Sequence, residues 1–207
     1  MALQNRCDPF GTLYAVAARG SKMGNRGGRI HDPGTKRLGG RRWASKSWIC
    51  CVTEFRNRQH DVWGKTYTVL FFLDEVTALA SGHRPCFECR NADAKCFARL
   101  WAQAEGRRER MKAAEMDEHL HRERMASSPA APPGLSAEAV AALPDGCMVA
   151  LDGRPFAVKA GKLLPWSFSG YGPARRMPSR QASLITPTSI VEVLRQGYEP
   201  RWHGGAL

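Results

Sequence analysis

Residues 67–90 read YTVLFFLDEVTALASGHRPCFECR, and this stretch holds most of the local signals that decide the fold. Its first residues, Tyr67–Leu73, are mainly β-branched, aromatic or leucine, which predicts a buried strand. Asp74 can cap a short helix over Glu75–Ser81, and Gly82 can end that helix. A Cys-x-x-Cys turn closes the stretch. The sequence therefore predicts a strand, a helix and a thiol-rich turn in close succession.

Patterns on either side of this stretch predict the remaining elements. A strand over Trp48–Phe55 precedes it, and a helix over Asn91–Ala104 follows it, with apolar residues at helical spacing. Residues 1–45 are rich in glycine and arginine and show neither the helical nor the strand periodicity of apolar residues, which predicts an ordered loop or an arm. The expected fold class is α+β. Further predicted elements are helices over 107–126 and Ser189–Gln196, a brief helix or turn over 136–143, and strands over Cys147–Leu151 and Pro155–Val158.

The Cys-x-x-Cys turn is the strongest chemical signal in the chain. It places the thiolates of Cys86 and Cys89 where one tetrahedral Zn²⁺ ion can accept both. Cys50 and Cys51 can supply further thiolates, although adjacent residues of a strand point to opposite faces. The alternatives are that one of these two joins a histidine on the metal, or that the thiols are simply buried. The candidate histidines are His31, His60 and His83.

Residues Phe71–Arg90 resemble the second half of the metal-binding domain of the Ada family of DNA methylation-repair proteins. The shared pattern runs from an aromatic pair through an alanine-rich helix to a Gly-x-Arg-Pro-Cys-x-x-Cys turn. In that family four cysteines hold zinc, and one of them accepts a methyl group from a DNA phosphotriester. The resemblance implies that Cys86 and Cys89 are the second ligand pair, and that Cys50 or Cys51 is the first ligand and methyl acceptor.

This resemblance covers about 40 residues, roughly a fifth of the chain. Glu54 and Phe55 stand where the family has its second cysteine, and the stretch between the ligand pairs is longer here. The whole chain also resembles an uncharacterised bacterial family that shares the QNR and PFG segments, the MGNRGG segment and the GHRPC turn. That second resemblance implies no activity.

The chain is strongly basic, with 31 Lys+Arg against 19 Asp+Glu and a formal net charge of +12. Residues 1–65 hold 13 basic and 4 acidic residues, and residues 153–207 hold 8 and 2. Guanidinium groups match phosphate oxygens, so a nucleic-acid partner is favoured over an arginine-rich composition without a binding role. Glycines of the N-terminal segment let a backbone approach DNA closely. The expected DNA-binding residues are Arg19, Asn25, Arg26, Arg29, Arg41, Arg42, Arg84 and Arg90.

Two further segments can carry chemistry. Asp117 and His121 lie four apart on the helix expected over 107–126, so the carboxylate can orient the imidazole as a general base or metal ligand. A solvated, charge-paired helix face is the alternative. The aromatic residues within 165–171 lie beside Arg175 and Arg176 and can stack on splayed bases, or else pack a small sheet.

The sequence thus predicts a zinc-containing DNA-binding protein of DNA repair or genome maintenance that recognises damaged or single-stranded DNA. The alternatives are a nuclease or base-processing enzyme that uses Asp117 and His121, and a zinc-stabilised regulator with a protein partner. No apolar run approaches the ~20 residues of a membrane span, and we expect a cytoplasmic location. The expected regions are 1–104 (arm and Ada-like zinc module), 105–134 (charged helix and Pro/Ala linker) and 135–207 (small β-rich unit).

Overall fold

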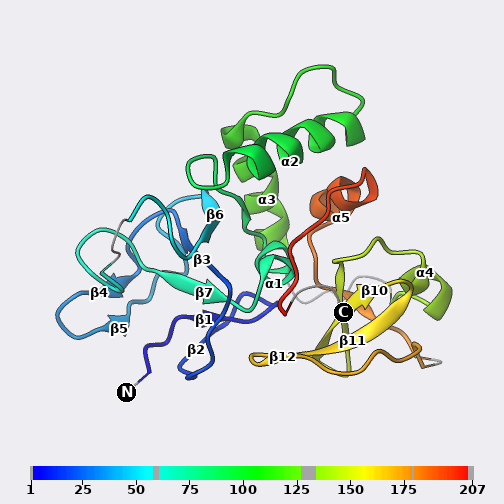
Figure 1. Cartoon of the computed structure of the whole chain (residues 1–207), viewed down its shortest axis with the longest axis horizontal. Helices are drawn as coiled ribbons and strands as arrows, with labels where there is room; N and C mark the ends of the chain where they lie inside the picture. Colours follow the sequence, from blue (N-terminus) through cyan, green and yellow to red (C-terminus); the bar gives the residue numbers. More distant parts are fainter. Residues whose placement is uncertain (1, 58–60, 127–133, 179, 205–207) are drawn as a thin grey trace.

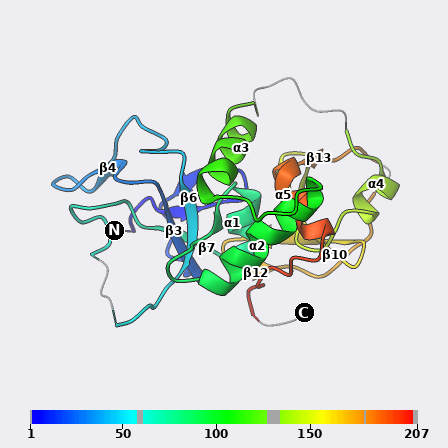
Figure 2. The ribbon, with the colours of Figure 1, turned by 90° about the horizontal axis from the view of Figure 1, so that it is seen from above.

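The computed structural model of the protein describes residues 2–57, 61–126, 134–178 and 180–204. Two main β-sheets lie toward opposite sides of the molecule, and a group of helices lies between them (Figure 1, Figure 2). The predicted α+β class is confirmed. The helices of the central group are α1 (Glu75–Ala80), α2 (Asn91–Ala104), α3 (Ala113–Ala126) and α5 (Thr188–Arg195).

The N-terminal sheet has six strands in the order β2-β1-β7-β3-β6-β8. The strand β3 pairs antiparallel with both β6 and β7, whereas β6 pairs parallel with the short β8. This pairing brings the start of the Cys-x-x-Cys turn beside the middle of β6. The strands are β1 (Arg6–Cys7), β2 (Leu13–Tyr14), β3 (Lys22–Arg26), β6 (Trp48–Val52), β7 (Leu70–Phe72) and β8 (Arg84–Pro85).

The prediction of a loop or arm over residues 1–45 is wrong for β3, which lies in the interior of the sheet. Gly24 in its middle hides the strand pattern, because it removes a side chain where an apolar one would mark the period. A Cβ atom at Gly24 would lie 2.0 Å from the carbonyl oxygen of Ile49 and 3.0 Å from the ring of Phe72. Glycine is therefore required for the close approach of neighbouring strands. Two further short strands, β4 (His31–Asp32) and β5 (Arg37–Leu38), form a separate hairpin.

The helix α1 forms close to its predicted position. The Asp74 side chain accepts a hydrogen bond from the backbone N–H of Thr77 at 2.9 Å, which caps the helix. Gly82, with φ at +79°, follows the helix end. The predicted bounds of α2 are also correct, and its buried residues Phe97 and Trp101 face the core.

The helix α3 starts six residues later than the pattern over 107–126 predicts. The carboxylate of Glu115 accepts a hydrogen bond from the backbone N–H of Lys112 at 2.7 Å, the side-chain half of a capping box. Met111, just before the helix, is fully buried and anchors the chain there. The charged residues ahead of it form a connection between α2 and α3.

The C-terminal sheet has five antiparallel strands in the order β12-β11-β10-β9-β13. The short helix α4 (Ala137–Ala141) lies on the side of this sheet away from α1 (Figure 1). Both predicted strands of this region are present, and the pairing of β10 with β11 extends them. The strands are β9 (Met148–Leu151), β10 (Arg154–Lys159), β11 (Lys162–Ser167), β12 (Gly170–Tyr171) and β13 (Ser183–Leu184).

The main apolar core joins residues from both sides of 127–133. It contains Phe97 and Trp101 of α2, Leu120 of α3 and Phe156 of β10 in one cluster. Division of the chain near residue 130 stays a prediction, but the helices of the N-terminal part and the C-terminal sheet share this core.

The first turn of α1 ties the C-terminal segment to the N-terminal sheet. Asp74 accepts hydrogen bonds from the Tyr171 hydroxyl at 2.9 Å and the His203 backbone N–H at 3.0 Å. Glu75 accepts from the Tyr198 hydroxyl at 2.7 Å and the Arg201 backbone N–H at 3.0 Å. Both carboxylates are fully buried, and hydrogen bonds of this kind are what permit charged groups in a core.

Candidate metal centre and basic residues

Three of the four predicted cysteine ligands lie together. Cys51 comes from β6, Cys86 directly follows β8, and Cys89 stands two residues before α2. Their sulfur atoms all lie within 4.8 Å of one another. Three thiolates on one tetrahedral ion at Zn–S distances of about 2.3 Å would lie slightly under 4 Å apart, so this cysteine triad can hold a metal ion.

The backbone around the triad is arranged for thiolates. The N–H of Cys86 donates to the carbonyl of Cys50 at 3.0 Å, which fixes the turn against β6. The N–H of Glu88 points back at the Cys86 sulfur at 3.4 Å. Hydrogen bonds from the Cys51 and Cys89 thiols lower the pKa of Cys86, whereas hydrogen bonds to Cys86 and Cys89 raise the pKa of Cys51. The pKa of Cys89 is raised as well. Without a cation the triad therefore favours one thiolate, at Cys86, while Cys51 and Cys89 keep their protons.

Cys50 does not join the triad. It alternates with Cys51 along β6, and its side chain lies in an apolar cluster with Leu70 and Phe72. Burial raises the pKa of Cys50 to about 12, and its sulfur accepts a hydrogen bond from Arg90 at 3.4 Å. This thiol packs the core, and Cys51 is the residue of the adjacent pair that faces the turn.

The candidate histidines have other partners. His31 contacts the Thr68 hydroxyl at 2.6 Å and the Gly64 carbonyl at 3.0 Å. His83 contacts the Ser81 hydroxyl at 2.9 Å through Nδ1. His60 lies outside the described residues. Neither described histidine is part of the metal-ligand cluster.

Three of the arginines expected to bind DNA are buried instead. Arg84 donates two hydrogen bonds of 2.8 Å to the Asp117 carboxylate. Arg90 forms ion pairs with Glu75 and Asp93, each at 2.7 Å. Arg26 is only 2% exposed. These buried side chains hold the fold together, and a contact between them and DNA stays a prediction. The remaining expected residues are Asn25, which is half-buried, and Arg19, Arg29, Arg41 and Arg42, which are exposed.

Asp117 and His121 lie on one face of α3. The carboxylate does not form the hydrogen bond to the imidazole that a general-base pair would require. Both oxygens of the Asp117 carboxylate bind Arg84. The Nδ1 atom of His121 is buried and has no hydrogen-bond partner among the described residues, while the ring packs against Trp43. The side chains thus serve separate contacts, and a catalytic pair stays a prediction.

A buried basic cluster around Trp48 is a feature that the sequence did not reveal. The guanidinium carbons of Arg26 and Arg124 lie 4.0 and 4.3 Å from the indole centroid, and the His83 ring lies 4.9 Å away. One nitrogen on each of these four side chains is buried with no hydrogen-bond partner in the described part of the chain. Burial lowers the pKa of Arg124 to about 10. The cluster holds two positive charges with no carboxylate ion pair among the described residues.

Comparison with known proteins adds no family or fold relative. No protein-family model matches the chain, and no curated protein or solved structure matches it. Within the described ranges, no helix combines the length and the apolar character needed to cross a membrane. The resemblance to the Ada metal-binding domain stays a prediction, and function rests on the residues themselves.

Proposed function

We propose that the protein is a zinc-containing DNA-binding protein of DNA repair or genome maintenance. The zinc site is supported by one observation, that the sulfur atoms of Cys51, Cys86 and Cys89 lie within 4.8 Å of one another. Thiolate ligands select soft or borderline ions, and zinc is the common one for cysteine sites of tetrahedral shape. Zinc would fix β6 to the turn that precedes α2, and a fourth ligand would complete its coordination.

The DNA-binding part is supported by charge. Arg19, Arg29, Arg41 and Arg42 are exposed, and none of them forms an ion pair with a described residue. Unpaired guanidinium groups are free to contact phosphates, and the net charge of +12 attracts a polyanion over longer range. A preference for damaged or single-stranded DNA is suggested by the resemblance to the Ada family.

The metal is tested by elemental analysis of the purified protein. We expect about one zinc per chain, retained in Cys96→Ser and lost in Cys86→Ser. Cys96 is a matched control because it is a partly buried cysteine on α2 outside the triad. Equal zinc content in both variants, or zinc-free wild-type protein that folds normally, would contradict the metal centre.

DNA binding is tested by fluorescence anisotropy over a series of salt concentrations. We expect Arg41→Gln/Arg42→Gln to weaken binding and to reduce the salt slope by roughly one per lost phosphate contact. Arg99→Gln/Arg108→Gln removes the same charge from exposed positions on and after α2. If both double variants change the slope equally, the effect is one of net charge and the N-terminal residues are not an interface.

A second candidate function is methyl transfer to Cys51. Cys51 belongs to the cysteine triad, whereas Cys50 is buried in an apolar cluster, so of the two residues matched to the methyl acceptor Cys51 is the one that can become a metal-bound thiolate. The Cys51 sulfur would form a bond to the methyl carbon of a phosphotriester, the C–O bond would break, and the phosphodiester anion would leave. Intact-mass analysis after incubation with methylphosphotriester DNA tests it. Addition of one methyl group to wild type but not to Cys51→Ser supports the transfer, and an unchanged wild-type mass refutes it.

A further inference from the structure

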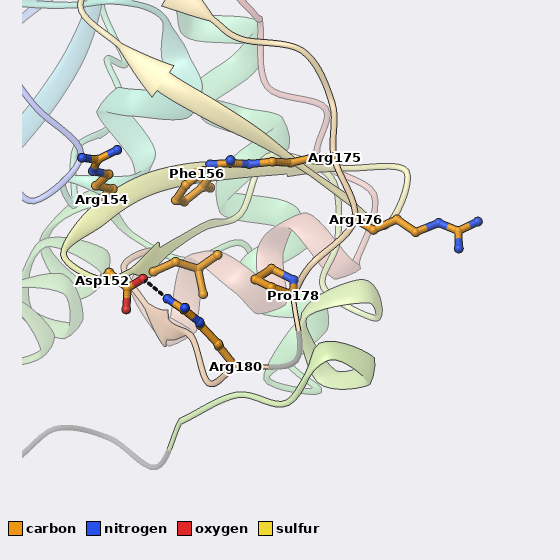
Figure 3. Close-up of a pocket in the computed structure, with 8 residues that line it drawn as sticks. Asp152, Arg154, Phe156, Arg175, Arg176, Pro178 and Arg180 are labelled. Atoms are coloured by element: carbon orange, nitrogen blue, oxygen red, sulfur yellow. Dashed lines mark hydrogen bonds and ion pairs between the residues drawn. The ribbon is translucent and has the colours of Figure 1, made fainter.

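A cavity of about 500 Å³ on the C-terminal sheet is lined by four arginines. Arg154 comes from β10, and Arg175, Arg176 and Arg180 come from the segment between β12 and β13. Figure 3 shows Arg175 lying along the ring of Phe156, whereas Arg176 is directed outward. Arginine side chains from two separate segments of the chain thus line one hollow, whose size is typical of a small-ligand site.

The charges in this cavity are largely uncompensated. Among the described residues that line it, Asp152 is the only acidic one, and it pairs with Arg180 at 2.7 Å. Arg154, Arg175 and Arg176 form no ion pair with any described residue. A terminal phosphate monoester carries close to two negative charges at neutral pH, whereas an internal phosphodiester carries one. The monoester is therefore the anion that this arrangement would bind more tightly.

The floor of the cavity suits a planar ring. Leu151 and Phe156 contribute apolar surface, and the guanidinium carbon of Arg175 lies 4.6 Å from the Phe156 centroid. A guanidinium plane held on an aromatic ring presents a flat face on which a nucleobase can stack. A hollow of this size also suits one nucleotide better than the convex side of a continuous duplex.

We propose that the cavity binds a nucleoside phosphomonoester, either as the 5′-phosphorylated end of a single strand or as a free nucleotide. This inference deepens the DNA-binding function proposed above and rests on it for the strand end. The phosphate would contact Arg154 and Arg175 from β10 and the following segment, and the terminal base would lie over Arg175.

The first test compares two single strands that differ only in a 5′-phosphate or a 5′-hydroxyl, each labelled at the 3′ end. We expect about tenfold tighter binding of the phosphorylated strand, as for a charge-assisted contact. Arg175→Gln, and Arg154→Gln as a second variant in case the first fails to fold, should abolish this difference while keeping affinity for the hydroxyl strand. Arg108→Gln has the same charge change at an exposed site elsewhere and should preserve it.

Asp152→Asn provides a gain-of-function test. Residue 152 has φ at +48°, a conformation that asparagine tolerates, so the turn should be kept. The substitution removes the competing carboxylate and frees Arg180, and we expect phosphate affinity to rise a few-fold.

Calorimetric titration with deoxythymidine monophosphate separates the two sources of the ligand. If the free nucleotide binds, Arg175→Gln weakens this binding and neither strand binds, the nucleotide site in the cavity is supported. The DNA-binding proposal is then overturned. Equal binding of both strands, with Arg175→Gln behaving like Arg108→Gln, would refute the phosphomonoester site in the cavity. The DNA-binding proposal would then remain in place. Absence of binding to the nucleotide and to both strands would refute both.

Discussion

Replacement of Glu75 by glutamine should destabilise the protein by about 3 kcal/mol. The Glu75 side chain is fully buried and forms an ion pair with Arg90 at 2.7 Å. It also accepts hydrogen bonds from the Tyr198 hydroxyl at 2.7 Å and from the Arg201 backbone N–H at 3.0 Å. Loss of one partner from a buried ion pair costs about 3–5 kcal/mol. We take the lower end because Asp93 also pairs with Arg90 and remains in the variant.

Urea unfolding followed by circular dichroism measures this loss. The control is Glu138→Gln, which makes the same change at an exposed position in the first turn of α4. Tyr198→Phe should cost about 1.5 kcal/mol, and a double-mutant cycle with Glu75→Gln should reveal a coupling of about 1 kcal/mol. A loss below about 1 kcal/mol for Glu75→Gln, or no coupling with Tyr198, would show that the buried carboxylate is not what holds these segments together.

Three further outcomes are expected. Cys51→Ala should lose its bound metal, whereas Cys50→Ala should keep it and lose only packing, as elemental analysis of both would show. Burial holds the pKa of His83 well below its usual value of 6.5, so the folded state stays neutral while the unfolded chain binds a proton. Stability should therefore fall by up to about 1.4 kcal/mol per pH unit below 6.5, and urea titrations at pH 5–7 should show a shallower slope for His83→Gln. Gly24→Ala should cost about 3 kcal/mol because its Cβ would lie 2.0 Å from a carbonyl oxygen, whereas Gly40→Ala, with open space around it, should stay within about 0.5 kcal/mol of wild type in the same urea assay.

Local signals explain why part of the fold could be predicted. The helix α2 has its predicted bounds, and the bounds of α1 differ from the predicted ones by one residue. Both helices could be predicted because caps and apolar spacing act over a few residues. The strand β3 was missed because it is held by partners far along the chain, and Gly24 removes the apolar residue that would have marked it. Short-range patterns cannot report a strand that depends on its neighbours in this way.

The candidate site shows the same limit. The turn containing Cys86 and Cys89 is a local motif, and alternation along a strand predicts that Cys50 and Cys51 face opposite ways. Which of the two faces the turn depends on the parallel pairing of β6 with β8, which the sequence does not state. Likewise, composition counts Arg84 as a basic residue but does not reveal that Asp117, 33 positions later, neutralises it in the interior.

The buried carboxylates of α1 also set an order of events during synthesis. Glu75 and Arg90 leave the ribosome well before Tyr198 and the N–H of Arg201, which lie 123 and 126 positions after Glu75. Until then the turn that contains Cys86 and Cys89 adjoins a charged group that lacks two of its hydrogen-bond donors. The N-terminal half should consequently be a poor candidate for expression as a fragment, and the proposed metal site should reach full affinity only after the segment that holds Tyr198 and Arg201 has docked.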